Sequence, residues 1–195
     1  MRAARLSGSV LASGDMPDRA WDAGLSVLLT REQIQQRVAE LARIIAADHA
    51  PGEDLHLVAI LKGAFLFLGD LVRAMDRHVT LDFMAVSSYG KGTSSSGEVR
   101  MVKDLDAGLE GRNVVIIEDI VDTGLTLSYL QEILRARSPR SLRTACLLNK
   151  PSRRKVDVKV EYVGFTIEDR FVVGYGLDYG ERYRNLPYIG VINAG

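Results

Sequence analysis

The sequence has a single cysteine, and this scarcity limits the compartments and chemistries that are open to it. One thiol, Cys146, cannot form an internal disulfide, which is typical of a protein from a reducing compartment. Because Cys146 lies in the apolar run "RTACLLN", we predict a buried, unreactive thiol rather than a nucleophile.

The chain also lacks an excess of charge and any long hydrophobic run. Its 25 basic and 25 acidic residues cancel, which argues against a general nucleic-acid-binding surface or an anionic-membrane surface. No stretch approaches the roughly 18–20 apolar residues of a membrane span. The first 21 residues contain only a broken apolar run, whereas a secretory signal needs a longer one. We therefore expect a cytoplasmic protein that binds neither nucleic acid nor membrane.

Several common catalytic and binding motifs are absent as well. A P-loop needs G-x-x-x-x-G-K-[ST], and a dinucleotide-binding fold needs G-x-G-x-x-G; neither pattern occurs. The three histidines, His49, His56 and His78, match neither zinc-ligand spacing nor a catalytic triad. We assign them no function.

The chain of 195 residues is 47% hydrophobic, which is enough for one domain with its own core. No repeat or linker divides it. We interpret residues 1–26 as an irregular N-terminal extension with a tendency to poor order, and residues 27–195 as a single domain.

Helices and strands alternate over most of this domain. Thr30 and Gln33 fit a capping box, and apolar residues at helical spacing follow them, which predicts a helix over 31–48. The remaining patterns predict strands over 55–61, 79–89, 112–119 and 141–149, helices over 64–76 and 125–137, and short strands over 160–167 and 170–179. This alternation predicts an α/β fold with a mostly parallel sheet, to which residues near 80–105 add an antiparallel hairpin. Residues 90–99, "GKGTSSSGEV", cannot bury themselves, so we predict a mobile segment.

The stretch "IIEDIVDTGLT", residues 116–126, holds three acids between a buried strand and a helix. Ligands of open α/β sheets bind at the carboxyl ends of the strands. Backbone N–H groups after Asp122 can wrap an anion at the helix N-terminus, helped by two threonine hydroxyls and by the flexibility of Gly124.

Glu118 and Asp119 would repel such an anion, so they must face hydroxyls, a divalent cation or both. A phosphate cup beside two such acids is typical of a site for a phosphorylated sugar. The alternative is an acidic cluster that stabilises the helix dipole by about 0.3–1 kcal/mol per charge. That would account for Asp122 but not for two acids at the end of a buried strand.

The stretch "VVIIEDIVDTGLT" resembles the 5-phosphoribosyl-1-pyrophosphate (PRPP) binding motif of type I phosphoribosyltransferases, and most closely that of the bacterial hypoxanthine and hypoxanthine-guanine members. The resemblance runs from Val27 to Ile192 and includes, in order, "LKGA", "SSYG", "LLNKP" and "VGFTIEDRFVVGYGLDYGERYRNLPYIGVI". It implies a central, mostly parallel sheet flanked by helices, with a flexible hairpin lid and a small hood subdomain built from the chain ends.

The resemblance also assigns roles around the acid-rich turn. It implies that Glu118 and Asp119 bind the ribose hydroxyls of PRPP and its Mg²⁺, and that Asp122 is the general acid/base beside the purine N7. The residues that would hold the 5′-phosphate are Asp122, Thr123, Gly124, Leu125 and Thr126. Some relatives carry a basic residue at the position of Leu125, so this sequence departs from them in its phosphate cup.

Further residues acquire roles in the pyrophosphate and purine sites. Pyrophosphate would meet Lys62 and Gly63, where the Leu61–Lys62 peptide can be cis in the family, together with Arg184 and the lid residues Ser88 and Tyr89. For the purine, the resemblance implies that Lys150 binds the exocyclic oxygen, Phe171 stacks on the ring and Val172 offers backbone groups. Asp178 would border the purine and bind a second Mg²⁺ through water.

The reaction that the resemblance implies joins PRPP to hypoxanthine or guanine, giving IMP or GMP and pyrophosphate, with Mg²⁺ as cofactor. It leaves open the preference among hypoxanthine, guanine and xanthine, and a homodimer or homotetramer is expected. One alternative is a regulator of transcription that senses PRPP or purines, although residues 1–26 are too short for a helix-turn-helix. Another is a sibling transferase for a different base.

Overall fold

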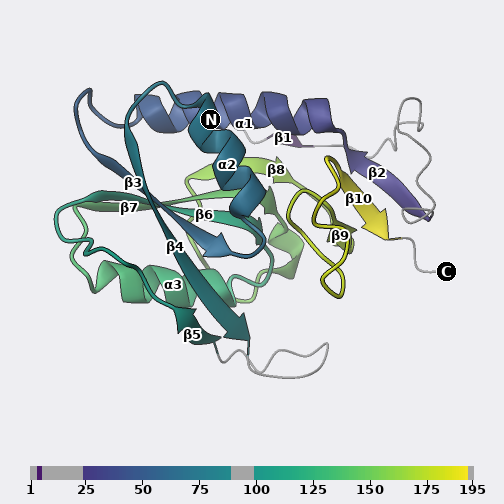
Figure 1. Ribbon diagram of the computed structural model, residues 1–195. Coiled ribbons are helices and arrows are strands. Elements are labelled where there is room, and N and C mark those ends of the chain that lie inside the picture. The colour runs from purple at the N-terminus through teal and green to yellow at the C-terminus, as the bar shows by residue number, and fades with distance from the viewer. Residues whose placement is uncertain (1–3, 6–23, 89–98, 193–195) are drawn as a thin grey trace.

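The computed structural model describes residues 4–5, 24–88 and 99–192 (Figure 1). Most of the expected N-terminal extension, and residues 90–98 of the expected mobile segment 90–99, lie outside these residues. Within the extension, strand β1 (Ala4–Arg5) pairs in parallel with β8 (Tyr162–Thr166). This short segment therefore joins the edge of the sheet.

The first long helix, α1 (Arg31–Ala47), begins where the capping pattern predicted. The Thr30 hydroxyl accepts a hydrogen bond from Gln33 N, and the Gln33 side chain accepts one from Thr30 N. This reciprocal pair satisfies two N–H groups that the first turn leaves without partners. The prediction of a helix starting at residue 31 is confirmed.

Within the described residues, the main sheet has seven strands in the order β1-β8-β7-β6-β3-β4-β5. Its remaining strands are β3 (Leu55–Leu61), β4 (Val79–Ser88), β5 (Val99–Lys103), β6 (Asn113–Val121) and β7 (Ser141–Asn149). Neighbours run parallel except β4 and β5, which form the expected antiparallel hairpin. The predicted α/β fold with a mostly parallel sheet is confirmed.

Helices cover both faces of this sheet (Figure 1). Leu57 and Ala59 of β3 pack in a cluster with α1 and α2 (Phe65–Ala74), whereas Val58 and Ile60 pack on the other face with α3 (Leu125–Arg135). Successive side chains of a strand point to opposite faces, so a continuous apolar run is buried on both sides. The described residues contain no helix that is long and apolar enough to cross a membrane.

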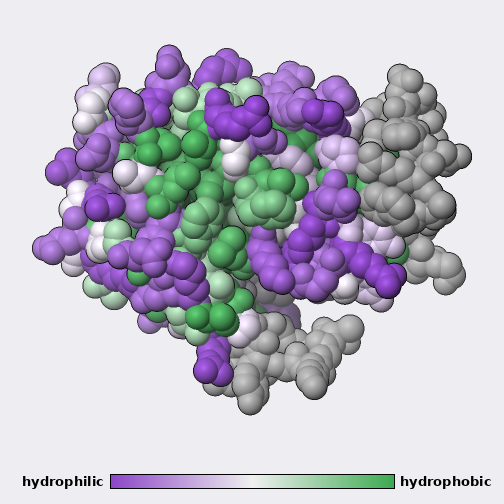
Figure 2. Space-filling model, in the orientation of Figure 1, coloured by the Kyte–Doolittle hydropathy of each residue, from purple (hydrophilic) through white to green (hydrophobic). Residues whose placement is uncertain are grey.

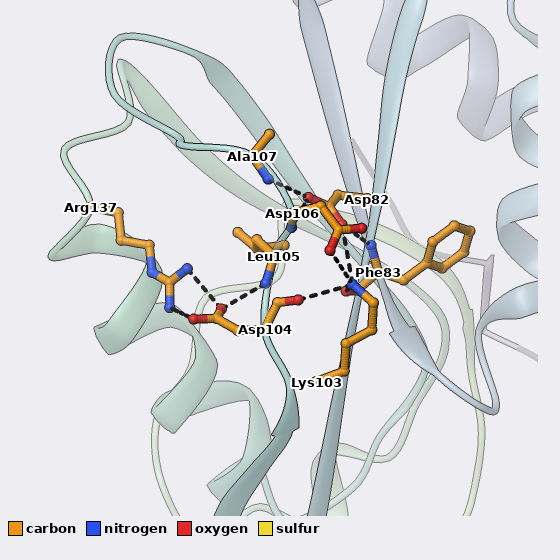
Figure 3. Close-up of polar contacts among 8 residues, drawn as sticks. All are labelled: Asp82, Phe83, Lys103, Asp104, Leu105, Asp106, Ala107 and Arg137. Atoms are coloured by element: carbon orange, nitrogen blue, oxygen red, sulfur yellow. Dashed lines mark hydrogen bonds and ion pairs between the residues drawn. The ribbon is translucent and has the colours of Figure 1, made fainter.

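A buried carboxylate ties the base of the β4–β5 hairpin together (Figure 3). Asp82 accepts hydrogen bonds from Asp106 N (2.8 Å) and Ala107 N (3.2 Å), and Lys103 Nζ lies 3.7 Å from its Oδ1. Burial raises the pKa of Asp82, but the backbone hydrogen bonds outweigh it and the net pKa is lowered. Asp82 therefore stays ionised and anchors the hairpin at the end away from Ser88.

The two ends of the domain build a second, antiparallel sheet in the order β2-β10-β9. Its strands are β2 (Leu25–Leu29), β9 (Val172–Val173) and β10 (Ile189–Ile192). Figure 1 shows this sheet beside the main one, with the yellow C-terminal segment looping between them. It corresponds to the expected hood subdomain.

One strand prediction is wrong in extent. Only Val172–Val173 of the expected strand 170–179 is extended, because Gly174 and Gly176 (both φ +98°) and Tyr175 (φ +49°) turn the chain. Residues with positive φ do not have the extended conformation of a strand, so the chain turns away from the sheet here. A Cβ on Gly176 would lie 2.1 Å from Gly63 O, so the turn packs directly on the loop after β3.

Candidate active site

The carboxyl ends of neighbouring parallel strands bring the predicted residues to one edge of the sheet. Glu118 and Asp119 stand near the end of β6, Lys62 directly follows β3, and Lys150 directly follows β7. Since β3 and β7 are the two neighbours of β6, segments far apart in sequence meet here. The prediction that the acid-rich turn lies at this edge is confirmed.

The acidic pair is held in a poorly solvated environment. Glu118 is buried, and burial, followed by the charge of Asp119, raises its pKa well above the ordinary value. Burial also raises the pKa of Asp119 to about 6, although the Ile120 N–H and the Arg184 cation oppose the shift. Two carboxyls that ionise reluctantly would both gain from a bound cation.

The turn after β6 has the geometry of an anion cup. Gly124 has φ +85° and precedes α3, and Leu125 N donates to the Thr123 hydroxyl at 3.4 Å. Gly124 has no side chain to cap the helix, so the N–H groups of the first turn after Leu125 can donate to an anion. The residues assigned to the 5′-phosphate, Asp122 to Thr126, lie together in this turn.

The segment after Lys150 supports the cup from one side. Lys155 N donates to Thr123 O at 2.9 Å, and the Arg154 guanidinium donates to Asp122 O at 3.0 Å. Arg154 also donates to the Asn149 side chain at the end of β7. Local sequence patterns could not predict these contacts with Asp122 and Thr123, because the bonded residues lie about 30 positions apart in the chain.

A cavity of about 350 Å³ opens beside Asp122. Five predicted residues line it, namely Asp122, Lys150, Phe171, Val172 and Asp178. It also exposes residues that sequence reasoning missed: Ile120, Arg153, Asp169, Arg170 and Leu177. The structure thus brings the residues assigned to the purine together with the proposed acid/base.

A cation, Lys150, and an aromatic ring, Phe171, line this cavity. Lys150 is 6% exposed; its Nζ donates to Arg170 O at 2.5 Å, and burial lowers its pKa. Phe171 is 55% exposed and meets Tyr179 edge to face, with ring centroids 5.4 Å apart. A ring this exposed offers a face on which a planar ligand can stack.

Asp122 is joined through an arginine to a second aspartate that lines the same cavity. Arg153 Nε donates to Asp122 Oδ1 at 3.2 Å, and its NH1 group lies 3.4 Å from Asp169 Oδ2. Half-exposed pairs of this kind are weak, so a ligand can replace them.

The residues assigned to pyrophosphate form a second charged group. Lys62 Nζ lies 3.0 Å from Glu181 Oε2, and Arg184 NH2 lies 2.9 Å from Asp178 Oδ1. The Leu61–Lys62 peptide bond is cis. Among the described residues, Arg184 Nε is buried without a hydrogen-bond partner and so retains an unused donor. Glu181 was not anticipated; only its spacing from Arg184 could have suggested it.

Two predicted residues are placed incompletely. Ser88 ends β4 and pairs with Val99, but its side chain lies outside the described atoms, as does all of Tyr89. Cys146 is buried and its pKa is raised by burial, so the prediction of a buried thiol is confirmed.

No group of three metal-ligating side chains comes together within the described residues. Mg²⁺, however, is commonly bound through one or two carboxylates together with water and substrate phosphates. Glu118 and Asp119 supply hard oxygen donors whose ionised forms are disfavoured by burial, so their chemistry fits such an ion.

Comparisons with known proteins agree with this geometry. Residues 25–180 match the family model of the phosphoribosyl transferase domain. The chain is 53% identical over 166 residues to a hypoxanthine-guanine phosphoribosyltransferase of Bacillus subtilis, covering 85% of this chain and 92% of the relative. It is 56% identical over 173 residues to one of Mycobacterium tuberculosis, covering 86% of each.

Solved structures give the same answer for the fold. A crystal structure of a hypoxanthine phosphoribosyltransferase from Staphylococcus aureus superposes with a TM-score of 0.86 at 48% identity, covering 90% of this chain and 96% of that one. The family model spans the acid-rich turn and every residue that lines the cavity beside Asp122. The chain therefore belongs to the type I phosphoribosyltransferase family, in its hypoxanthine-guanine phosphoribosyltransferase branch.

Proposed function

We propose that the protein transfers the 5-phosphoribosyl group of PRPP to hypoxanthine or guanine, giving IMP or GMP and pyrophosphate, as a purine-salvage enzyme that uses Mg²⁺. One observation supports this choice of base. The buried ammonium of Lys150 and the carboxylate of Asp122 line the same cavity. An ammonium donates hydrogen bonds and accepts none, so it suits the 6-oxo group of these purines.

The purine would lie against the Phe171 ring in this cavity, whose lining also includes the apolar side chains of Ile120 and Leu177. Its 6-oxo group would take the hydrogen bond that Lys150 now donates to the Arg170 carbonyl, or share it. The backbone of Val172 would meet the N1 edge, where a 6-oxopurine carries a proton. These contacts orient N9 of the purine toward the sugar.

Asp122 would handle the proton on N7 of the purine. It lies in the cavity at the entrance to the anion cup, so it can face the base while Thr123 to Thr126 hold the 5′-phosphate. Removing the N7 proton makes N9 a better nucleophile as the bond to the sugar forms. The ion pair between Asp122 and Arg153 must break before Asp122 can accept this proton. Because both side chains are partly exposed, breaking the pair costs little free energy.

The acidic pair would hold the ribose. Glu118 and Asp119 would accept hydrogen bonds from its hydroxyls and provide oxygen ligands for Mg²⁺, and Asp178 would hold a second ion through water. When bound, Mg²⁺ supplies charge neutralisation for the departing pyrophosphate. Lys62, Arg184 and the N–H groups near Gly63 would stabilise the same charge, and we propose this role for Ser88 and Tyr89 as well.

We also propose that the protein is cytoplasmic and acts as a homodimer or homotetramer. In support of assembly, Phe65, Leu81 and Val102 are 42%, 44% and 66% exposed. Figure 2 displays apolar side chains gathered over α2 and β4 on one face. A contiguous apolar surface of this kind is typical of an interaction site.

The test is an assay of nucleotide formation from PRPP with hypoxanthine, guanine, xanthine and adenine in turn. We expect turnover with hypoxanthine or guanine, dependence on Mg²⁺, and rejection of adenine. Comparable kcat/KM for adenine and hypoxanthine would refute the assignment, as would PRPP binding without turnover of any base.

A further inference from the structure

The two cations assigned to pyrophosphate are already joined by a carboxylate of the chain itself. Glu181 reaches Lys62 Nζ with Oε2 at 3.0 Å and Arg184 NH2 with Oε1 at 3.3 Å. Each oxygen therefore contacts a different cation. Lys62 follows β3 and Glu181 lies 119 residues later, so only the tertiary fold brings this bridge together.

The backbone at Glu181 is built to present its side chain. Tyr179 and Arg182 exchange both backbone hydrogen bonds at 3.2 Å, which closes a two-residue turn over Gly180 and Glu181. Gly180 has φ +58° and Glu181 has φ +64°. Positive φ at both central residues is what a type I′ turn requires, and its second central position is usually filled by glycine.

Glutamate is an unfavourable residue at that position, because its Cβ crowds the backbone when φ is positive. The Asp178 carboxylate helps to hold the turn by accepting from Glu181 N at 2.9 Å. Strained backbone of this kind concentrates at functional sites. The positive φ of Glu181, together with its bridge between Lys62 and Arg184, therefore indicates that the carboxylate of residue 181 has a function.

The bridging carboxylate stays ionised. The hydrogen bond from Lys62, followed by that from Arg184, lowers the pKa of Glu181. Glu181 and Arg184 also border an open cavity of about 530 Å³, which leaves room for a larger anion beside them. An oxyanion that takes the donor positions of Lys62 Nζ and Arg184 NH2 that now face Glu181 has to replace the contacts of Glu181.

We propose that Glu181 occupies the pyrophosphate subsite of the empty enzyme, releases Lys62 and Arg184 when the pyrophosphate of PRPP binds, and returns to them as product pyrophosphate leaves. It acts through the two cations and is thus a positioning residue. The inference rests on the proposed function of Lys62 and Arg184.

The effect should be modest, because the contacts are exposed. The Lys62 and Glu181 side chains are both 66% exposed, and exposed ion pairs are weak individually. Loss of both contacts should tighten pyrophosphate binding by about two- to tenfold.

The test compares Glu181→Gln with the unmodified enzyme by calorimetric titration of inorganic pyrophosphate in the presence of Mg²⁺. We expect the Kd for pyrophosphate and the KM for PRPP to fall two- to tenfold while kcat does not rise. The matched control is Glu40→Gln, which removes one carboxylate from a 2.7 Å ion pair with Arg37 on α1, outside the site. It should leave both constants unchanged.

Unchanged or weaker pyrophosphate binding by Glu181→Gln would overturn the proposal, since it would mean that Glu181 supports the cations without competing for them. An equal gain in affinity in Glu40→Gln would overturn it too, because net charge would then be the cause. Failure of the unmodified enzyme to bind pyrophosphate would instead contradict the functions assigned to Lys62 and Arg184.

Discussion

Gly63 lies directly against the carboxylate of Asp119. A Cβ built on Gly63 would come within 1.6 Å of Asp119 Oδ2, a distance that no packed structure tolerates. The loop after β3 and the acidic pair of β6 therefore occupy one tightly packed unit, and residue 63 has to be glycine for Asp119 to keep its place.

Replacing Gly63 by alanine should displace the Asp119 side chain and weaken PRPP binding by at least tenfold. Calorimetry with PRPP and Mg²⁺ measures the loss. Gly69→Ala is the matched control, because a Cβ there meets nothing within 4 Å and the residue lies inside α2. That control should bind PRPP normally and raise stability by about 0.5–1 kcal/mol. Equal PRPP affinity in both variants would show that the contact is unimportant.

Asp122→Asn should keep the fold and PRPP binding but lower turnover by about 10²–10⁴-fold, because a well-placed acid/base contributes that much. Steady-state kinetics gives kcat, and calorimetry gives the affinity for PRPP. A variant that turns over as fast as the unmodified enzyme would remove Asp122 from the mechanism.

Base selectivity should depend on Lys150. Adenine presents a donor where the Lys150 ammonium also donates, so it forfeits a charged hydrogen bond of about 1.5–3 kcal/mol and adds repulsion. Sites built on such pairs reject the wrong partner by about 10⁴–10⁵-fold. Lys150→Gln, whose amide can donate or accept, should lose activity on hypoxanthine and narrow the gap in kcat/KM between the two bases. An unchanged gap would refute the role.

The contribution of Asp119 to the stability of the ligand-free protein should fall between about pH 4 and pH 6. Its pKa rises from 3.8 to about 6 on folding, so the folded state holds a proton that the unfolded chain releases. The resulting stabilisation is complete below pH 4 and lost as the pH passes 6. Asp119 is largely buried, and the charges of Arg184 and Asp178 act on its carboxyl in opposite directions, so we expect a loss of about 1–3 kcal/mol.

Urea unfolding at pH 4.5 and pH 6.5, with the unmodified protein and Asp119→Asn, isolates this contribution. The unmodified protein should lose more stability than the variant between the two pH values. Identical losses in the two proteins would contradict the prediction, whatever the other carboxyls contribute.

Much of the fold could be predicted from local sequence. The start of α1 depends on Thr30 and Gln33, three residues apart, and the buried runs of β3 and β6 depend on apolar residues in succession. The anion cup follows from Gly124, which lies two residues after Asp122 and directly before α3. Such interactions join neighbours along the chain, so the residue types alone predict them.

The sequence by itself determined the alternation of strands and helices, the acidic edge of the sheet and the cup beside it. Only the tertiary structure decided that Glu181 bridges Lys62 and Arg184, that Gly63 packs on Asp119 and that Arg153 reaches Asp122. It also turned residues 174–176 away from the expected strand, onto the loop at Gly63. The physical reason is the distance along the chain between the interacting residues. Local patterns predict hydrogen bonds and burial within one segment, whereas contacts between distant segments depend on how the layers of the fold pack together.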